Sequence, residues 1–435
     1  MNSVCIAAHR PRRGATILLA VSALAISTAM LAQTSYGQSA AGQSNPDKSA
    51  AKVEEPKETI RQVIAAPMLA AEKLLAEKKY QAALEQIAEA EKADGKTPYE
   101  LYNLDRMRAI AGLGVGNDAL AVKSLESAIA SGRVPASETL NIVDGIARIH
   151  YRQKDYKQAA VWAARATREP GSRIEMRLLL GHSAYLSNDF NTAKAEIAAV
   201  IAAAEKAGTP PPEDQLRLLG SASLKTDDTA GYVAALEKLA VRFPKKDYWA
   251  DLIYRVESRK GFAERLALDV YRLKLITGVM SEKADFLEMA SQTLQSGYPV
   301  EAQKVIDAGL AAGVLVKDTR VDSEKKLRES IGKELAEENA RAAKGNRPAP
   351  KGSVAILNNG FDSVLKGDAA KGLEMMETAI KAGDLRRPED AKLRYGIALV
   401  LAGQKAKAGE ILNTVQGADG NAALAHLWEL FSRQQ

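Results

Sequence analysis

The chain has 435 residues with a formal net charge of +6; 46% are apolar, 5% aromatic and 26% charged. This apolar content can bury a substantial core and excludes a wholly disordered chain. The single cysteine, Cys5, excludes an intramolecular disulfide framework and any metal site built from several cysteines. Because aromatics are scarce and Ala and Leu abundant, the composition favours closely packed helices over sheets.

The N-terminal segment, Met1–Ala41, has the three parts of a secretory signal peptide. Residues 1–14 carry three arginines and no acidic residue, and an apolar stretch follows that is densest over Ile17–Ile26. Small and polar residues then lead from Gln33 to Ala41. This order of a basic, an apolar and a small-residue segment predicts export.

The pattern leaves two cleavage points open, after Ala32 or after Ala41. An uncleaved membrane anchor is the alternative, but the apolar run is short for a span of ~20 residues, which favours cleavage. Cleavage removes Cys5 and three positive charges, so the mature net charge falls from +6 to +3. A charge of +3 gives no reason to expect nucleic acid as a partner, or stable membrane insertion after cleavage.

Composition and pattern divide the rest of the chain into four parts. Residues 42–58 are polar, contain prolines and predict a flexible linker. From residue 59 apolar residues recur at three- and four-residue spacing, which predicts a helical array over 59–343. Residues 344–353 (KGNRPAPKGS) predict a hinge, and 354–435 are predicted to hold further repeats and a capping helix.

Two segments of the array repeat each other at a fixed distance. Ile149–Ala160 (IHYRQKDYKQAA) aligns with Ser183–Lys194 (SAYLSNDFNTAK). The matched pairs are Tyr151 with Tyr185, Asp155 with Asp189, Tyr156 with Phe190, and Ala159 with Ala193. The common offset of these pairs, about 34 residues, is the period of the tetratricopeptide repeat (TPR), a helix–turn–helix unit. The chain resembles this family.

The resemblance implies an all-α fold, a right-handed superhelical solenoid of antiparallel helix pairs, with nine or so pairs in the chain. The family pattern has a small residue within the first helix, an aromatic opening the second helix, and Ala three residues later. The residues that match it, expected to be structural, are Tyr80, Ala83, Tyr156, Ala159, Gly181, Phe190, Ala193, Gly220, Gly396 and Ala408. Such pairs bury their apolar faces only by stacking on their neighbours.

The chain departs from this pattern in several places. The Leu101–Gly132 unit lacks the aromatic, and its glycines (Gly112–Gly116) are expected to form the turn within the repeat; residues 245–282 fit the period poorly. Asp322–Lys344 predicts a charged helix with a narrow stripe of Leu327, Ile331 and Leu335. Asn421–Gln435 predicts a single capping helix.

Phe243–Gly278 is the most distinctive stretch, because it holds six of the 22 aromatic residues together with many basic residues. Aromatics and Arg are favoured interface anchors, so one interpretation is a partner-binding patch. The other is that the rings fill a junction where the repeat is irregular, with Arg on the solvated face. The candidate patch residues are Tyr248, Trp249, Tyr254, Arg255, Arg259, Arg265 and Tyr271.

No motif predicts catalysis, a cofactor or a metal. His150 and His182 lie on the first helices of consecutive repeats, but no carboxylate or cysteine set accompanies them, so they are interpreted as ordinary helix imidazoles. We therefore expect no enzymatic activity and no cofactor.

These observations favour an exported, periplasmic or secreted scaffold that binds proteins or peptides on an extended helical surface. Two alternatives remain open from the sequence. One is a cell-wall factor that binds or processes glycans on a helical solenoid. The other is a structural subunit of an envelope complex.

Overall fold

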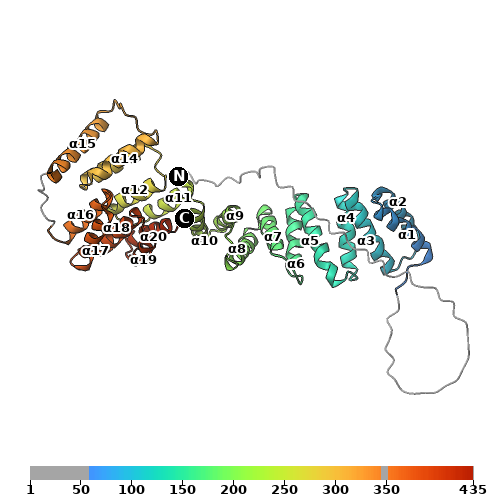
Figure 1. Cartoon of the computed structure of the whole chain (residues 1–435). Coiled ribbons are helices and arrows are strands. Elements are labelled where there is room, and N and C mark those ends of the chain that lie inside the picture. Colours follow the sequence, from blue (N-terminus) through green and yellow to red (C-terminus); the bar gives the residue numbers. More distant parts are fainter. Residues whose placement is uncertain (1–57, 344–350, 435) are drawn as a thin grey trace, which may run out of the picture. The chain divides into compact units, whose positions relative to one another are not determined.

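The computed structural model describes residues 58–343 and 351–434, and every regular element within them is a helix. The predicted signal peptide, the linker up to residue 57 and residues 344–350 of the predicted hinge lie outside the described residues. The described chain forms two compact units that divide between Thr139 and Leu140. The first unit contains α1 Gln62–Ala76, α2 Tyr80–Glu91, α3 Pro98–Gly114 and α4 Asp118–Ala130 (Figure 1).

The second unit begins within α5, whose first residues precede the division. Its elements are α5 Ala136–Arg152, α6 Tyr156–Ala166, α7 Ile174–Leu186, α8 Phe190–Lys206, α9 Glu213–Lys225, α10 Thr229–Arg242, α11 Lys246–Glu257, the 3-10 turn η1 Glu264–Leu266, α12 Ala267–Ile276, α13 Lys283–Gln295, α14 Pro299–Ala311, α15 Asp322–Ala343, α16 Ser353–Leu365, α17 Ala369–Lys381, α18 Pro388–Leu401, α19 Lys405–Leu412 and α20 Asn421–Ser432. Within the described residues these helices form nine pairs, with α15 and α20 outside them. The predicted all-α fold of stacked helix pairs is confirmed.

One left-handed turn residue sets the register of eight of these pairs. The residues with positive φ at this place are Lys78, Gly116, Lys154, Asn188, Asp227, Gly297, Gly367 and Gly403. Seven residues before each stands a small residue: Ala71, Ala109, Ala147, Gly181, Gly220, Ala290, Gly360 and Gly396. Two residues after each, the second helix begins. The turn residue thus fixes which small side chain of the first helix faces the second.

The repeat length varies although this local register does not. Along the turn residues from Lys78 to Asp227, the interval is shortest between Lys154 and Asn188, and every other interval is longer by four or five residues. The offset seen in the sequence therefore holds between the third and fourth pairs, and the others carry longer connections. The structure also shows that Gly116 is the turn residue of the second pair, which lacks an aromatic at the start of its second helix, as expected for its glycine-rich turn.

The small residues allow helices to approach closely. A Cβ atom at Gly181 would lie 2.7 Å from Cδ1 of Ile197, and one at Gly360 would lie 2.6 Å from the carbonyl oxygen of Gly372. No side chain fits at such distances without movement of its neighbour. At Gly360 the obstacle is backbone, so only glycine fits at the observed helix spacing, whereas at Gly181 the Ile197 side chain would have to move.

The residues expected to be structural lie where the helices meet. Tyr80, Tyr156 and Phe190 each begin a second helix, and Ala83, Ala159, Ala193 and Ala408 are fully buried. The rings of Tyr151 and Tyr156 meet edge-on at 5.5 Å, and those of Tyr185 and Phe190 at 5.4 Å. An aromatic pair therefore fills the wedge beside the turn in these two repeats.

The pair α11–α12 is the exception to the register. Its left-handed residue is Gly261, but seven residues earlier stands Tyr254 instead of a small residue, and the 3-10 turn precedes α12. The residue in this place is 64% exposed, and α12 begins six residues after Gly261, so the register of the other pairs is absent here. The expectation that residues 245–282 depart from the repeat is confirmed.

The C-terminal helices pack back onto this irregular pair. One buried apolar cluster joins residues from α8 to α12 with residues from α16 to α20. The ring of Trp249 in α11 lies 6.0 Å from that of Phe431 in α20, and the amide of Ala263 donates to the carbonyl of Asp419 at 2.9 Å. Figure 1 shows α20 beside α10 and α11. We call α10–α20 the closed lobe.

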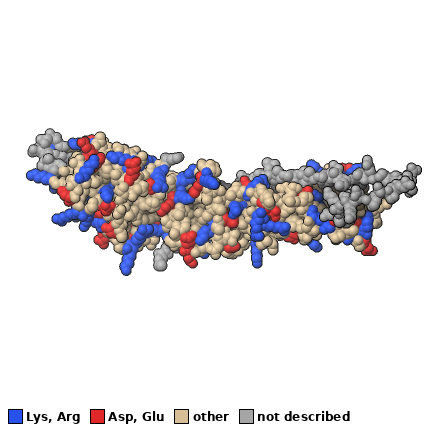
Figure 2. All heavy atoms as spheres, turned by 90° about the horizontal axis from the view of Figure 1, so that it is seen from below, with Lys and Arg blue, Asp and Glu red and all other residues tan. Residues whose placement is uncertain are grey.

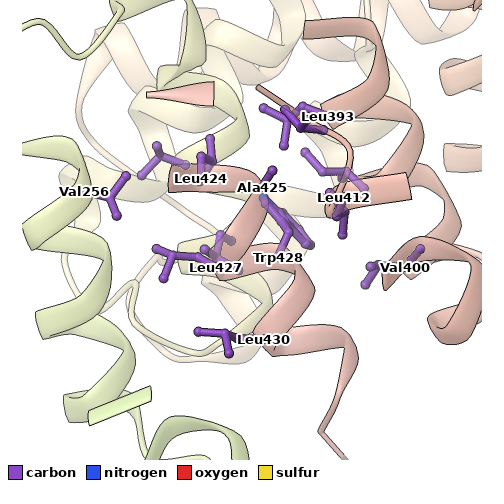
Figure 3. Close-up of a cluster of buried hydrophobic side chains, with 14 of the residues drawn as sticks. Val256, Leu393, Val400, Leu412, Leu424, Ala425, Leu427, Trp428 and Leu430 are labelled. Atoms are coloured by element: carbon purple, nitrogen blue, oxygen red, sulfur yellow. The ribbon is translucent and has the colours of Figure 1, made fainter. Parts of the chain in front are cut away.

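The centre of this packing is α20. Leu424, Leu427 and Trp428 are almost completely buried, and Figure 3 shows them between Val256 of α11 and Leu412 of α19. The predicted helix at Asn421 is confirmed over Asn421–Ser432, but it contacts α10 and α11 as well as the preceding pair. It therefore closes the lobe in addition to ending the array.

The predicted charged helix is α15, Asp322–Ala343. Ile331 is fully buried against α13 and α14, and Leu327 and Leu335 are partly buried in the same cluster. The narrow apolar stripe is thus used within the chain.

Candidate partner-binding surface

The structure divides the predicted patch into buried residues and solvent-facing residues. Tyr248 is 6% exposed and Trp249 1% exposed, because both belong to the core of the closed lobe. The Tyr248 hydroxyl donates to Glu213 at 2.5 Å, and burial together with this carboxylate raises the pKa of Tyr248 above its usual range. These two rings are core residues that a partner does not reach.

Two arginines of the patch are held by carboxylates. Arg265 donates to both oxygens of Asp390, at 2.8 and 3.0 Å, and also pairs with Asp419. Arg255 donates to Asp251 at 2.6 Å, and its guanidinium lies 4.8 Å from the ring centre of Tyr232. The hydrogen bonds that Arg265 donates to Asp390 and Asp419 raise its pKa. Arg265 thus joins the α11–α12 connection to α18 and to the loop before α20.

The remaining residues of the patch reach solvent to different degrees. Tyr254 is 64% exposed, and Arg259 is exposed beside the loop that precedes α20. Tyr271 is half-buried, with the ammonium of Lys274 5.4 Å from its ring centre. As a surface for a partner, the patch therefore reduces to Tyr254 and Arg259 with the outer edge of Arg255.

A second surface becomes visible once the repeats are aligned on their turns. Three residues before the left-handed residue, the first helices α5, α7 and α9 carry Tyr151, Tyr185 and Leu224. Leu224 is 45% exposed, and so is Leu186, which follows Tyr185. Equivalent positions of stacked repeats lie along one edge, so we call Tyr151, Tyr185 and Leu224, together with the neighbouring Leu186, the apolar ladder.

Polar contacts between first helices hold this ladder in place. The hydroxyls of Tyr185 and Ser221 are 2.6 Å apart and join α7 to α9. Arg173, just before α7, donates to Asp144 of α5 at 3.3 Å. First helices of consecutive repeats thus lie side by side, and the ladder runs across them.

His182 lies one turn before Tyr185 on the same face of α7. Burial lowers its pKa, and this effect outweighs the opposing influence of Asp214. The imidazole is therefore neutral at neutral pH and adds a donor and an acceptor beside the ladder.

The surface carries charges of both signs. On the face drawn in Figure 2, Lys and Arg side chains alternate with Asp and Glu along the described chain. Charged side chains also pair between repeats, such as Lys194 with Asp228 at 3.1 Å and Lys238 with Glu205 at 2.5 Å. This mixed pattern gives no continuous phosphate-binding track on that face.

Two shallow hollows lie at the seam of the closed lobe. One, of about 330 Å³, is lined by Arg259, Phe262 and small residues of the loop and first turn of α20 (Gly417, Ala418, Gly420, Ala422, Ala423). The other, of about 380 Å³, lies between Arg387 and Asn421. Within residues 58–343 and 351–434, no group of three or more His, Cys, Asp or Glu side chains is placed to hold a metal ion. Among those same residues, no helix has the length and apolar character needed to cross a bilayer.

Comparison with known proteins gives likenesses among solved structures only. No family model and no curated protein sequence matches the chain. The structure is similar to the C-terminal part of a TPR repeat-containing protein from Cytophaga hutchinsonii (17% identity, TM-score 0.28, 60% of this chain and 98% of that one). It is also similar to PilW, described as a widely conserved type IV pilus biogenesis factor (16%, 0.23, 57% and 100%).

A third similar structure is that of Naa15/Naa10 bound to HypK-THB (16% identity, TM-score 0.31), where the match covers 81% of this chain and 58% of that one. The assignment of this chain as a helical repeat rests on its own turns and small residues.

The sequence alone did not reveal the ladder. Tyr151 and Tyr185 were visible as a repeated pair, but Leu224 stands five positions later than a strict repetition of their offset would place it. An alignment on the Lys-Asp, Asn-Asp and Asp-Asp dipeptides at the turns, residues 154–155, 188–189 and 227–228, would have found it.

Proposed function

We propose that this protein is a binding scaffold for proteins or peptides, and that the apolar ladder is its contact surface. The observation that carries the proposal is a row of large side chains near the turn ends of three consecutive first helices: Tyr151 and Tyr185 are partly exposed, and Leu186 and Leu224 are each 45% exposed. Exposed apolar groups gathered on one surface are typical of interaction sites. Tyr contributes a large contact area with few rotatable bonds, which suits it to anchor a partner.

Site-specific photo-crosslinking tests this proposal. A photoreactive phenylalanine is placed at Leu224 in the full chain, and the matched control carries it at Val161, which is 57% exposed on the second helix α6. We expect discrete protein or peptide adducts from the Leu224 variant in the producing cells, and none from the Val161 variant. Equal adduct patterns at both positions would rule out the ladder as the contact surface.

Substitution separates binding from folding. Replacing Leu186 and Leu224 by Asp should abolish the adducts formed from a photoreactive group at Tyr185, while Val161→Asp should leave them unchanged. Both leucines are about half exposed, so the helical content should stay that of the unmodified chain. Adducts that persist in the double variant would contradict the role of the ladder.

We also propose that the scaffold acts outside the cytoplasm, as a periplasmic or secreted protein. The support is the order of basic, apolar and small-residue segments over residues 1–41. Cell fractionation with intact-mass measurement tests it, because cleavage after Ala32 and cleavage after Ala41 leave chains of different mass. An uncut chain in the cytoplasmic fraction would overturn this part of the proposal, and an uncut chain in the membrane would favour the anchor.

A further inference from the structure

A group of buried charges lies where five helices of the closed lobe converge. Arg272 of α12 is 5% exposed and donates to both oxygens of Glu301 of α14, each at 2.7 Å. Its third contact is Asp269 of the same helix at 2.6 Å. The face of the guanidinium lies 4.4 Å from the ring centre of Phe361 in α16. Every side of this cation is thus occupied by a partner from a defined helix.

Asp269 extends the group to the two C-terminal helices. It is fully buried, and its second carboxylate oxygen receives Nε of Arg394 of α18 at 3.4 Å. Its backbone carbonyl accepts from the indole N–H of Trp428 of α20 at 3.4 Å. We call Asp269, Arg272, Glu301 and Arg394 the buried charge network; it holds two cations and two anions and is neutral overall.

The free energy needed to remove these charges from water offsets much of what their pairing contributes to stability. Buried ion pairs gain little over apolar side chains of similar volume, while removal of one partner leaves an uncompensated charge. The network therefore penalises wrong arrangements more than it stabilises the right one.

The helices α18–α20 could pack on α10–α12 in a register other than the native one. The contacts between α10–α12 and α18–α20 join residues 125 to 194 positions apart, so no short connection fixes their register. Much of the shared core is apolar, and two further polar pairs cross the same interface, Arg265 with Asp390 and His426 with Glu237. Apolar contacts are not directional, and a slip of one helical turn, ~5.4 Å, preserves most of them. The same slip would separate Asp269 from Arg394 of α18 and move Phe361 of α16 away from the guanidinium of Arg272. The bonds of Arg272 to Glu301 and Asp269 lie within α12–α14 and would remain.

We propose that the buried charge network is a registration device that selects the single closed arrangement of the lobe, while the apolar core supplies the stability. The network is far from the apolar ladder in sequence and acts whether or not the ladder binds a partner. The full chain with Asp269→Leu, Arg272→Met and Glu301→Met folds, but its C-terminal helices dock in more than one register.

Spin-label distances test this directly. Labels are attached at Lys260→Cys and Ala406→Cys, two exposed positions on either side of the seam, in the full chain with Cys5→Ser. The unmodified network should give one narrow distance distribution. The triple variant should keep its helical circular dichroism and give a broad or split distribution. A single narrow distribution at the native distance in the triple variant would overturn the proposal.

Arg394→Met is the milder variant, because this side chain is 28% exposed and the fold should survive its loss. It should add a second distance population, which Arg394→Lys should largely remove. If the triple variant unfolds and Arg394→Met retains the native distance, the network provides stability and not register, and the proposal fails. A control, Arg61→Met with Glu100→Gln in the first unit, should leave the distribution unchanged.

Discussion

The first unit and the closed lobe are built from the same helix pair but are stabilised differently. In the first unit, long-range side-chain contacts stay between neighbouring repeats, as in the pair of Arg61 with Glu100 at 2.9 Å. This pair holds the pKa of Glu100 at about 2. In the closed lobe, helices from opposite ends share one core. In this chain, helices far apart in the sequence therefore share a core where α20 packs on the irregular pair α11–α12.

The largest expected effect comes from truncation at the centre of the closed lobe. Trp428→Ala removes a fully buried ring and should cost about 3–5 kcal/mol of the free energy of unfolding. Because α20 touches both ends of the lobe, hydrogen exchange should accelerate in α10, α11 and α18 together, while α1–α4 stay protected. Leu104→Ala, at a fully buried site of the first unit, should affect α1–α4 alone. Loss of protection restricted to α18–α20 in the Trp428 variant would contradict a shared core.

Glycine substitutions should have intermediate effects of opposite sign. A methyl group at Gly360 meets the backbone oxygen of Gly372, so Gly360→Ala should destabilise the lobe by about 1–3 kcal/mol. At Gly145 in α5 the same methyl meets nothing within 4 Å, so Gly145→Ala should stabilise by about 0.5–1 kcal/mol through helix propensity. Urea denaturation of both variants measures the change in the free energy of unfolding. A change of the same sign in both would show that the helix spacing at Gly360 is adjustable.

Helix caps should show a smaller difference. The carboxylate of Asp189 accepts the amide of Thr192 at 3.1 Å at the start of α8, so Asp189→Ala should cost about 1 kcal/mol. Asp368 precedes α17 in the closed lobe but makes no such bond, so Asp368→Ala should change the unfolding free energy by less than half as much. Thermal unfolding of the two variants checks this order, and a larger loss for Asp368 would contradict it.

The smallest effect is a pH dependence of the lobe. His426 of α20 contacts Glu237 of α10 at 3.0 Å, and this hydrogen bond raises the pKa of His426 above 6.5. A raised pKa stabilises the fold most below pH 6.5, and the contribution is lost as the pH rises through the folded value. Because the imidazole is 45% exposed, the loss between pH 6 and 8 should be only ~0.3 kcal/mol relative to His426→Gln. A pH profile of unfolding that is identical in the two proteins would show that the pair contributes nothing.

The local structure of this protein could be predicted from the sequence. The helix periodicity, the small residues and the turns predicted an all-α array, and the helices at Asp322 and Asn421 begin where predicted. The pattern also located the irregular repeat at residues 245–282. These features depend on contacts within one or two repeats, which periodicity and composition report directly.

The use of the irregular repeat became visible only in the folded chain. Trp249 and Tyr248 look like interface anchors in the sequence, but both are buried in the lobe, where Trp249 packs against Phe431 of α20 and Tyr248 donates to Glu213 of α9. Tyr254, three residues before the end of the same helix, faces solvent. The pairing of Arg265 with Asp390 and of Asp269 with Arg394 spans 125 residues each. Contacts between residues so far apart leave no mark in local periodicity, because they depend on which repeats the folded chain brings next to each other.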